Sequence, residues 1–231
     1  MNIQSGPAPL PLTDKHPASG RVAGALIAAA SLLSVVLMAH HPSVATPNIA
    51  DAVAELARQA TLTRQVHGGL IVLLGVLGLG FIELSRRLGI DRRTVQGALV
   101  AYAVGSGAMI GAALISGFIV PGLGVTYVAA PAADLEPLRY VLVLCRLGNR
   151  TLAGFAVSAM SAAILLWSIE LLRAPRAAPI AGCLGVLVAV GPVALLAFGA
   201  MTLDVGGMTL VVVAQALWSL AVSVPLMRAR L

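Results

Sequence analysis

The chain has 231 residues, of which 59% are apolar and only 10% are charged, and its formal net charge is +6. Soluble globular proteins carry about 25% charged residues, so this composition excludes an ordinary soluble domain and predicts an integral membrane protein. A basic chain can also bind nucleic acid, but no aromatic residues alternate with the arginines here. We therefore expect no nucleic-acid partner.

Residues 1–20 are rich in proline, glycine and serine, and such a segment is expected to form a disordered cytoplasmic tail. Residues 21–231 are predicted to form one transmembrane domain. A helix needs about 20 apolar residues to cross about 30 Å of hydrocarbon, and it satisfies its own backbone hydrogen bonds there. The predicted fold is therefore an all-α bundle of six transmembrane helices, at residues 21–39, 67–84, 95–120, 152–172, 179–201 and 207–227.

The distribution of basic residues predicts the orientation of the bundle. Most lysines and arginines fall in the tail, in the loops after the second and fourth apolar stretches, and at the C-terminus. Under the positive-inside rule these segments face the cytoplasm, together with both termini. The abundance of Ala, Leu, Val and Arg is typical of a bacterial source, so we expect a multi-pass protein of the bacterial inner membrane in contact with its lipids.

Two outer-face segments are predicted to be interfacial. In residues 42–66, Thr46 can cap a helix and Pro47 suits its first turn. An apolar stripe follows at helical spacing, so this helix is expected to lie in the headgroup layer with the stripe toward lipid. Residues 121–150 repeat the same layout of a turn and an apolar run. The stripe consists of Ile49, Val53, Leu56 and Ala60.

Similar short sequences suggest an internal duplication. Pro47-Asn-Ile-Ala-Asp resembles Pro131-Ala-Ala-Asp, and Ile82-Glu-Leu-Ser-Arg resembles Ile169-Glu-Leu-Leu-Arg. The first and second stretches would then match the third and fourth, and the last two would form an added hairpin. Small residues on several stretches let helices approach closely, and the same faces offer a surface for a homo-oligomer.

Three histidines are predicted to share one depth at the outer face. His40 and His41 end the first stretch, and His67 begins the second. Because neutral imidazole is the commonest transition-metal ligand, His67 with His40 or His41 predicts a site for copper, zinc or iron, completed by Asp51 or Glu55. A haem held by two histidines is a variant of this hypothesis. The alternative is that the histidines only bond headgroups, water or loop carbonyls.

Two further polar groups could form sites. Arg146, Asn149 and Arg150 enter the fourth stretch from the outer face, where they could hold an anion or a lipid phosphate; headgroup anchoring is the alternative. Gln215 lies near the centre of the last stretch, with Ser219 on the same face. These two side chains predict a polar cavity, or else hydrogen bonds to a neighbouring helix.

The basic N-terminus, Arg21-Val-Ala-Gly-Ala-Leu, Ser85-Arg-Arg-Leu-Gly and the six spans resemble a large group of uncharacterised six-helix bacterial inner-membrane proteins. The resemblance implies the fold and the localisation, and it transfers no activity. An enzyme is least favoured, because no nucleophile with an adjacent base is apparent. The predicted function is metal or haem binding at a periplasm-facing histidine site. A small transporter or channel for a small solute or lipophilic molecule, and a non-catalytic scaffold or complex subunit, are the alternatives.

Overall fold

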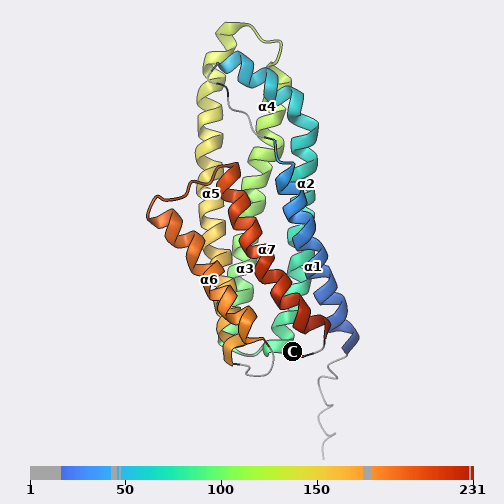
Figure 1. The fold of residues 1–231 in the computed structure, drawn as a ribbon. Coiled ribbons are helices and arrows are strands. Elements are labelled where there is room, and N and C mark those ends of the chain that lie inside the picture. Colours follow the sequence, from blue (N-terminus) through green and yellow to red (C-terminus); the bar gives the residue numbers. More distant parts are fainter. Residues whose placement is uncertain (1–16, 43–45, 47, 174–177, 229) are drawn as a thin grey trace, which may run out of the picture.

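A computed structural model describes residues 17–42, 46, 48–173, 178–228 and 230–231. All regular structure within these residues is helical (Figure 1). The described part contains six helical rods that are long and apolar enough to cross a membrane, so the predicted all-α six-helix bundle is confirmed. Its elements are α1 (Pro17–Ala39), α2 (Ile49–Leu88), α3 (Arg93–Leu114), the π-helical turn η1 (Ile115–Ile119), α4 (Val120–Tyr127), α5 (Ala132–Arg173), α6 (Pro179–Ala197) and α7 (Val205–Met227).

The six rods have two lengths. Helices α1, α6 and α7 contain 23, 19 and 23 residues, which at about 1.5 Å per residue matches the thickness of a bilayer core. By contrast, α2 and α5 contain 40 and 42 residues, and α3, η1 and α4 join into a third long rod. These three rods continue past the others at one end (Figure 1). We call the first half of α2, α4 and the first half of α5 the extension.

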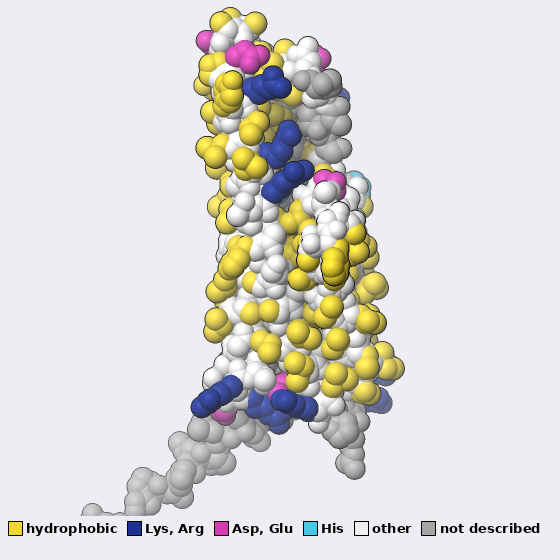
Figure 2. Space-filling view, turned by 90° about the vertical axis from the view of Figure 1, so that its left-hand side faces the viewer, with side chains coloured by type: hydrophobic (Ala, Val, Ile, Leu, Met, Phe, Trp, Pro, Cys, Tyr) yellow, Lys and Arg dark blue, Asp and Glu magenta, His cyan; other side chains and the backbone are white. Residues whose placement is uncertain are grey.

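Charged side chains mark the two ends of the spanning layer. We call the end where α1 begins and α7 ends the arginine end, because Arg86, Arg173 and Arg228 close or follow helices there. The opposite end, where α1 stops at Ala39, is the histidine end. Figure 2 shows basic side chains at the arginine end, a band without charged side chains above it, and charges again along the extension. This uncharged band is what a lipid-facing layer requires.

The structure corrects the prediction that an apolar stripe in residues 42–66 faces lipid. The helix is capped by Asn48 rather than Thr46, and it continues without a break into the membrane-spanning part of α2. Val53, in the middle of the stripe, is only 1% exposed because it packs against Leu135 and Leu138 of α5. The second outer segment thus supplies the apolar surface that the prediction assigned to the bilayer.

The predicted tail is only partly described. Residues 1–16 lie outside the described residues, whereas 17–20 form the first turn of α1. The prediction of disorder was therefore wrong for 17–20. Glu83 and Arg87 of α2 lie beside this turn: the Glu83 carboxylate accepts a hydrogen bond from Ser19 Oγ at 2.8 Å, and Arg87 Nη2 donates to Ser19 Oγ at 3.0 Å. These bonds fix the start of α1 against the end of α2.

Matching polar contacts at the arginine end support the predicted duplication. Ser19 Oγ of α1 donates to Glu83 Oε1 of α2 at 2.8 Å, and Thr94 Oγ1 of α3 donates to Glu170 Oε1 of α5 at 2.5 Å. Each carboxylate also pairs with an arginine of its own helix. Two antiparallel hairpins, α1 with α2 and α3 with α5, are thus closed by the same kind of bond.

An aromatic cluster forms the core of the spanning layer. Trp167 and Trp218 are fully buried and stack with their ring centroids 6.1 Å apart. Phe81 lies 5.0 Å from Trp167 and meets Tyr102 edge to face. Since aromatic side chains bury large areas, this cluster joins α2, α3, α5 and α7 into one core.

Candidate functional site

A cavity of about 770 Å³ lies at the histidine end, between α1, α2, α3, η1, α5 and the start of α7. We call this cavity the chamber. It brings together two groups of predicted site residues that come from opposite walls, the histidines and the arginines. Its polar lining residues are His41, Gln59, Thr63, His67, Ser116, Arg146, Asn149, Arg150 and Asp204.

Two histidines face one another in the chamber. His41 Nε2 lies 3.3 Å from His67 Nε2, and the two rings meet edge to face. His41 Nδ1 lies 2.8 Å from the Pro42 carbonyl, and His67 Nδ1 lies 2.9 Å from the Thr63 carbonyl. Because a carbonyl oxygen only accepts, these bonds assign a proton to both Nδ1 atoms. In the neutral form of each ring, Nε2 is then the unprotonated nitrogen.

The π-helical turn η1 supplies a third polar atom to this pair. Ser116 Oγ lies 2.9 Å from His67 Nε2 and 3.0 Å from the Ala112 carbonyl, and its one hydroxyl proton can be donated to either acceptor but not to both. Next to it, a Cβ on Gly117 would lie 2.3 Å from His67 Cβ, so only glycine lets α2 approach this turn. Sequence reasoning missed Ser116, because a Ser-Gly pair inside an apolar stretch is a weak signal. Single π turns often occur at functional sites.

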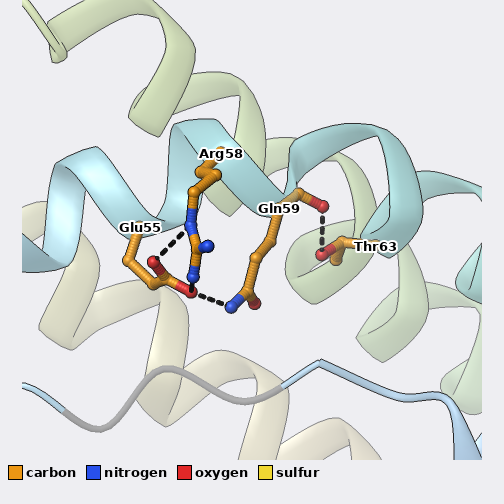
Figure 3. Close-up of polar contacts among 4 residues, drawn as sticks. All are labelled: Glu55, Arg58, Gln59 and Thr63. Atoms are coloured by element: carbon orange, nitrogen blue, oxygen red, sulfur yellow. Dashed lines mark hydrogen bonds and ion pairs between the residues drawn. The ribbon is translucent and has the colours of Figure 1, made fainter.

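Figure 3 shows a ladder of polar contacts on α2, upstream of His67 in the same helix. Arg58 Nη2 pairs with Glu55 Oε1 at 2.6 Å, and the Gln59 amide also donates to the Glu55 carboxylate. One turn further along, Thr63 Oγ1 donates to the Gln59 carbonyl at 2.9 Å. The ladder positions Gln59 and Thr63 at the chamber wall, and it engages Glu55 in an ion pair away from the histidines.

Several residues of the predicted metal site do not join the pair. His40 is exposed, and its Nδ1 bonds back to the Val36 carbonyl at 2.8 Å. Asp51 is exposed on α2, and neither it nor Glu55 lines the chamber. Across the described residues, no group of three or more His, Cys, Asp or Glu side chains is placed to hold a metal ion. Of the five predicted ligands, the structure brings together His41 and His67.

The opposite wall of the chamber is basic. Arg146 and Arg150 lie one turn apart on α5, and neither forms an ion pair among the described residues. The nearest acidic group in the lining is Asp204, which caps α7. Its carboxylate accepts from Gly207 N–H at 2.9 Å and from Thr202 Oγ1 at 2.8 Å. These bonds lower the pKa of Asp204, so the wall carries two positive charges and one negative charge at neutral pH.

A second cavity of about 110 Å³, the inner pocket, borders the chamber and lies deeper in the spanning layer. Gln215 and Ser219 line it, as does Trp218, but most of its lining is apolar. Ser31 is 2% exposed, and its Oγ has no hydrogen-bond partner within the described part of the chain. The two cavities share the lining residues Met38, Leu70, Leu74, Met109 and Met208.

Comparisons with protein-family models, curated proteins and solved structures found no match to this chain. The chemistry of the site therefore has to be argued from the chamber itself. Its two distinctive parts are an imidazole pair with both Nε2 atoms directed inward, and a basic wall above an apolar pocket.

Proposed function

We propose that this protein belongs to the bacterial inner membrane and binds a transition-metal ion at His41 and His67 on the periplasmic side. The observation that carries this proposal is the distance of 3.3 Å between the two Nε2 atoms. Two imidazole nitrogens bound tetrahedrally at about 2.0–2.1 Å from one ion lie about 3.3–3.4 Å apart. The pair is therefore spaced as two ligands of one ion.

The surroundings of the two rings favour metal binding over simple hydrogen bonding. Both Nδ1 atoms donate to backbone carbonyls, and such bonds orient ligating histidines and raise their basicity. Burial lowers the pKa of His41 below its ordinary value of 6.5. Its ring is then neutral at pH 7, which is the form that a metal ion requires.

Methionines near the pair favour monovalent copper. Met38 and Met109 line the same chamber as His41 and His67, and thioether sulfur is a soft ligand that selects Cu(I) over harder ions. Because Asp51 and Glu55 do not line the chamber, the thioether of one of these methionines would be the third ligand. Haem is less consistent with this geometry, because its macrocycle would have to lie between two nitrogens only 3.3 Å apart.

The first experiment is a Cu(I) titration of the detergent-purified, metal-free protein against a chromophoric chelator under anaerobic conditions. We expect one equivalent of copper per chain. His41→Ala or His67→Ala should weaken binding by at least tenfold, since even the loss of an outer partner of a ligand costs about 10–100-fold. His40→Ala is the matched control, because this neighbouring histidine is exposed and outside the chamber.

Methionine variants identify the metal. Met38→Leu or Met109→Leu should weaken Cu(I) binding more than Zn(II) binding, because a leucine keeps the volume and removes the soft sulfur. Unchanged copper affinity in both histidine variants would contradict the metal site. A Soret band in the absorption spectrum of the purified protein would show that the site holds haem instead of a single metal ion.

A further inference from the structure

The basic wall has no role in the metal site, and together with the inner pocket it has the layout of a ligand site. Ligand pockets commonly have volumes of about 300–1,000 Å³, with a few polar groups placed above an apolar lining. The chamber is within this range at about 770 Å³. It therefore has room for a molecule larger than a metal ion.

The head of such a molecule should be anionic. Arg146 and Arg150 project from successive turns of α5 into the chamber lining, and the Asn149 amide lies between them in the sequence. Guanidinium groups bind carboxylates through paired, charge-assisted hydrogen bonds. Asp204 is the acidic residue in the lining and interacts with Arg150, so one carboxylate faces two guanidinium groups and one positive charge is left in excess.

The tail of the molecule should be short and apolar. The inner pocket shares five lining residues with the chamber and is lined further in by Phe81, Trp218 and other apolar side chains. Its volume is about 110 Å³, somewhat less than the roughly 150 Å³ of an engineered cavity that holds benzene. The last few carbons of a chain would fill it. Ser31 Oγ, for which the described residues provide no hydrogen-bond partner, also lines this pocket.

We propose that the chamber binds a medium-chain carboxylic acid, with the carboxylate on Arg146 and Arg150 and the end of the chain in the inner pocket. The bound acid lies with its head at the histidine end and its tail inside the spanning layer. This arrangement suits a protein that binds or moves a lipophilic acid at the surface of a membrane. The charged head uses Arg146 and Arg150 whereas the metal uses His41 and His67, although Met38 and Met109 line both cavities.

Tryptophan fluorescence gives a direct readout of the tail. The chain has two tryptophans, and Trp218 lines the inner pocket whereas Trp167 does not. In metal-free protein reconstituted in neutral phosphatidylcholine nanodiscs, 8-bromooctanoate should quench the fluorescence saturably. Trp218→Phe should remove most of this quenching. Octylamine added in excess should not displace the acid, because it lacks the anionic head.

Arginine variants test the head. Arg146→Gln and Arg150→Gln should each weaken 8-bromooctanoate binding by about tenfold or more, the loss expected for charge-assisted hydrogen bonds. Arg139→Gln is the matched control, because Arg139 is an exposed arginine of the same helix that does not line the chamber. Its affinity should be unchanged. His41→Ala should also bind the acid normally, which separates this proposal from the metal site.

The chain length of the acid tests the inner pocket. Unbranched acids from butanoate to dodecanoate are measured as competitors of 8-bromooctanoate. Their affinity should rise with chain length and then level off once the chain fills the inner pocket. Ala216→Leu, which adds volume in the pocket lining, should shorten the chain length at which the rise stops. Linear quenching that is equal in wild type and in the Arg146→Gln, Arg150→Gln double variant would show partition into lipid and overturn the proposal.

Discussion

The two helical hairpins keep the same contact at the arginine end and carry different side chains at the histidine end. The shift in numbering that relates Ser19 of α1 to Thr94 of α3 also relates His41 to Ser116. The two members of the first pair bond equivalent glutamates. The two members of the second pair both contact His67 Nε2. Equivalent positions thus converge on one histidine of the chamber.

The two long helices show the same divergence. The shift that relates Glu83 of α2 to Glu170 of α5 also relates Gln59 to Arg146 and Thr63 to Arg150, and all four of the latter residues line the chamber. Under the predicted duplication, matching positions of the two hairpins therefore line the chamber, with imidazoles and an amide on one side and guanidinium groups on the other. The shared contact stabilises each hairpin, whereas the differing positions give the chamber its chemistry.

The largest expected effect is a difference in unfolding free energy between variants of the two glutamates that close the hairpins. Glu83 pairs with Arg87, whose side chain is 6% exposed, whereas the partners of Glu170, Arg92 and Arg173, are 57% and 61% exposed. Glu83→Gln removes the carboxylate from a buried guanidinium and should cost about 3–5 kcal/mol of unfolding free energy. The Glu170 side chain is the more buried carboxylate, at 1% exposed against 13% for Glu83. Its arginine partners are exposed and stay hydrated when it is made neutral, so Glu170→Gln should cost only about 1–2 kcal/mol.

Equilibrium unfolding in mixed micelles, followed by circular dichroism, measures both variants under one condition. Glu83→Asp is the control that keeps the charge while shortening the side chain. A loss in Glu170→Gln as large as in Glu83→Gln would show that the burial of the arginine does not set the cost.

A smaller effect on unfolding free energy is expected where the helices of the two hairpins pack together. A Cβ on Gly105 would lie 2.7 Å from Met160 Cγ and 3.1 Å from the Ala156 carbonyl, so Gly105→Ala should cost about 1–3 kcal/mol of unfolding free energy. The equivalent residue of the first hairpin is Ala30, which is buried with its methyl group in place. Gly107→Ala is the control, because nothing lies within 4 Å of its added Cβ. Equal unfolding midpoints for both glycine variants would contradict this reading of the α3–α5 contact.

Much of the fold follows from the sequence, because a bilayer imposes one dominant pattern. Apolar stretches of span length identify the six rods, and the histidines and arginines at the outer ends of those stretches had to meet at one level. The sequence similarity around Ile82 and Ile169 located the glutamates that close the two hairpins. These features depend on hydropathy and local spacing alone.

The remaining features depend on tertiary contacts that local patterns do not specify. An apolar stripe that faces lipid and one that faces another helix have the same amphipathic pattern in the sequence. For the stripe around Val53, only the packing on Leu135 in the structure shows that it faces a helix. His40 and His41 were equivalent candidates, but α1 stops at Ala39 and His40 bonds back to the helix. The position of Ser116 depends on a π turn, which has no distinct sequence pattern.

The smallest expected effect concerns the pH dependence of stability at His41, one of the histidines at which the two hairpins differ. Burial lowers the pKa of His41, so the folded state favours the neutral ring. The stability from this preference is fully present above pH 6.5 and is lost as the pH falls through the lower folded-state pKa. His41→Ser, which installs the residue type of the second repeat, should therefore flatten the fall in unfolding midpoint between pH 7.5 and pH 5. The comparison uses metal-free protein, and His40→Ser serves as the control for an exposed histidine. If the wild type and His41→Ser lost stability in parallel, the buried ring would not be the source of the pH dependence.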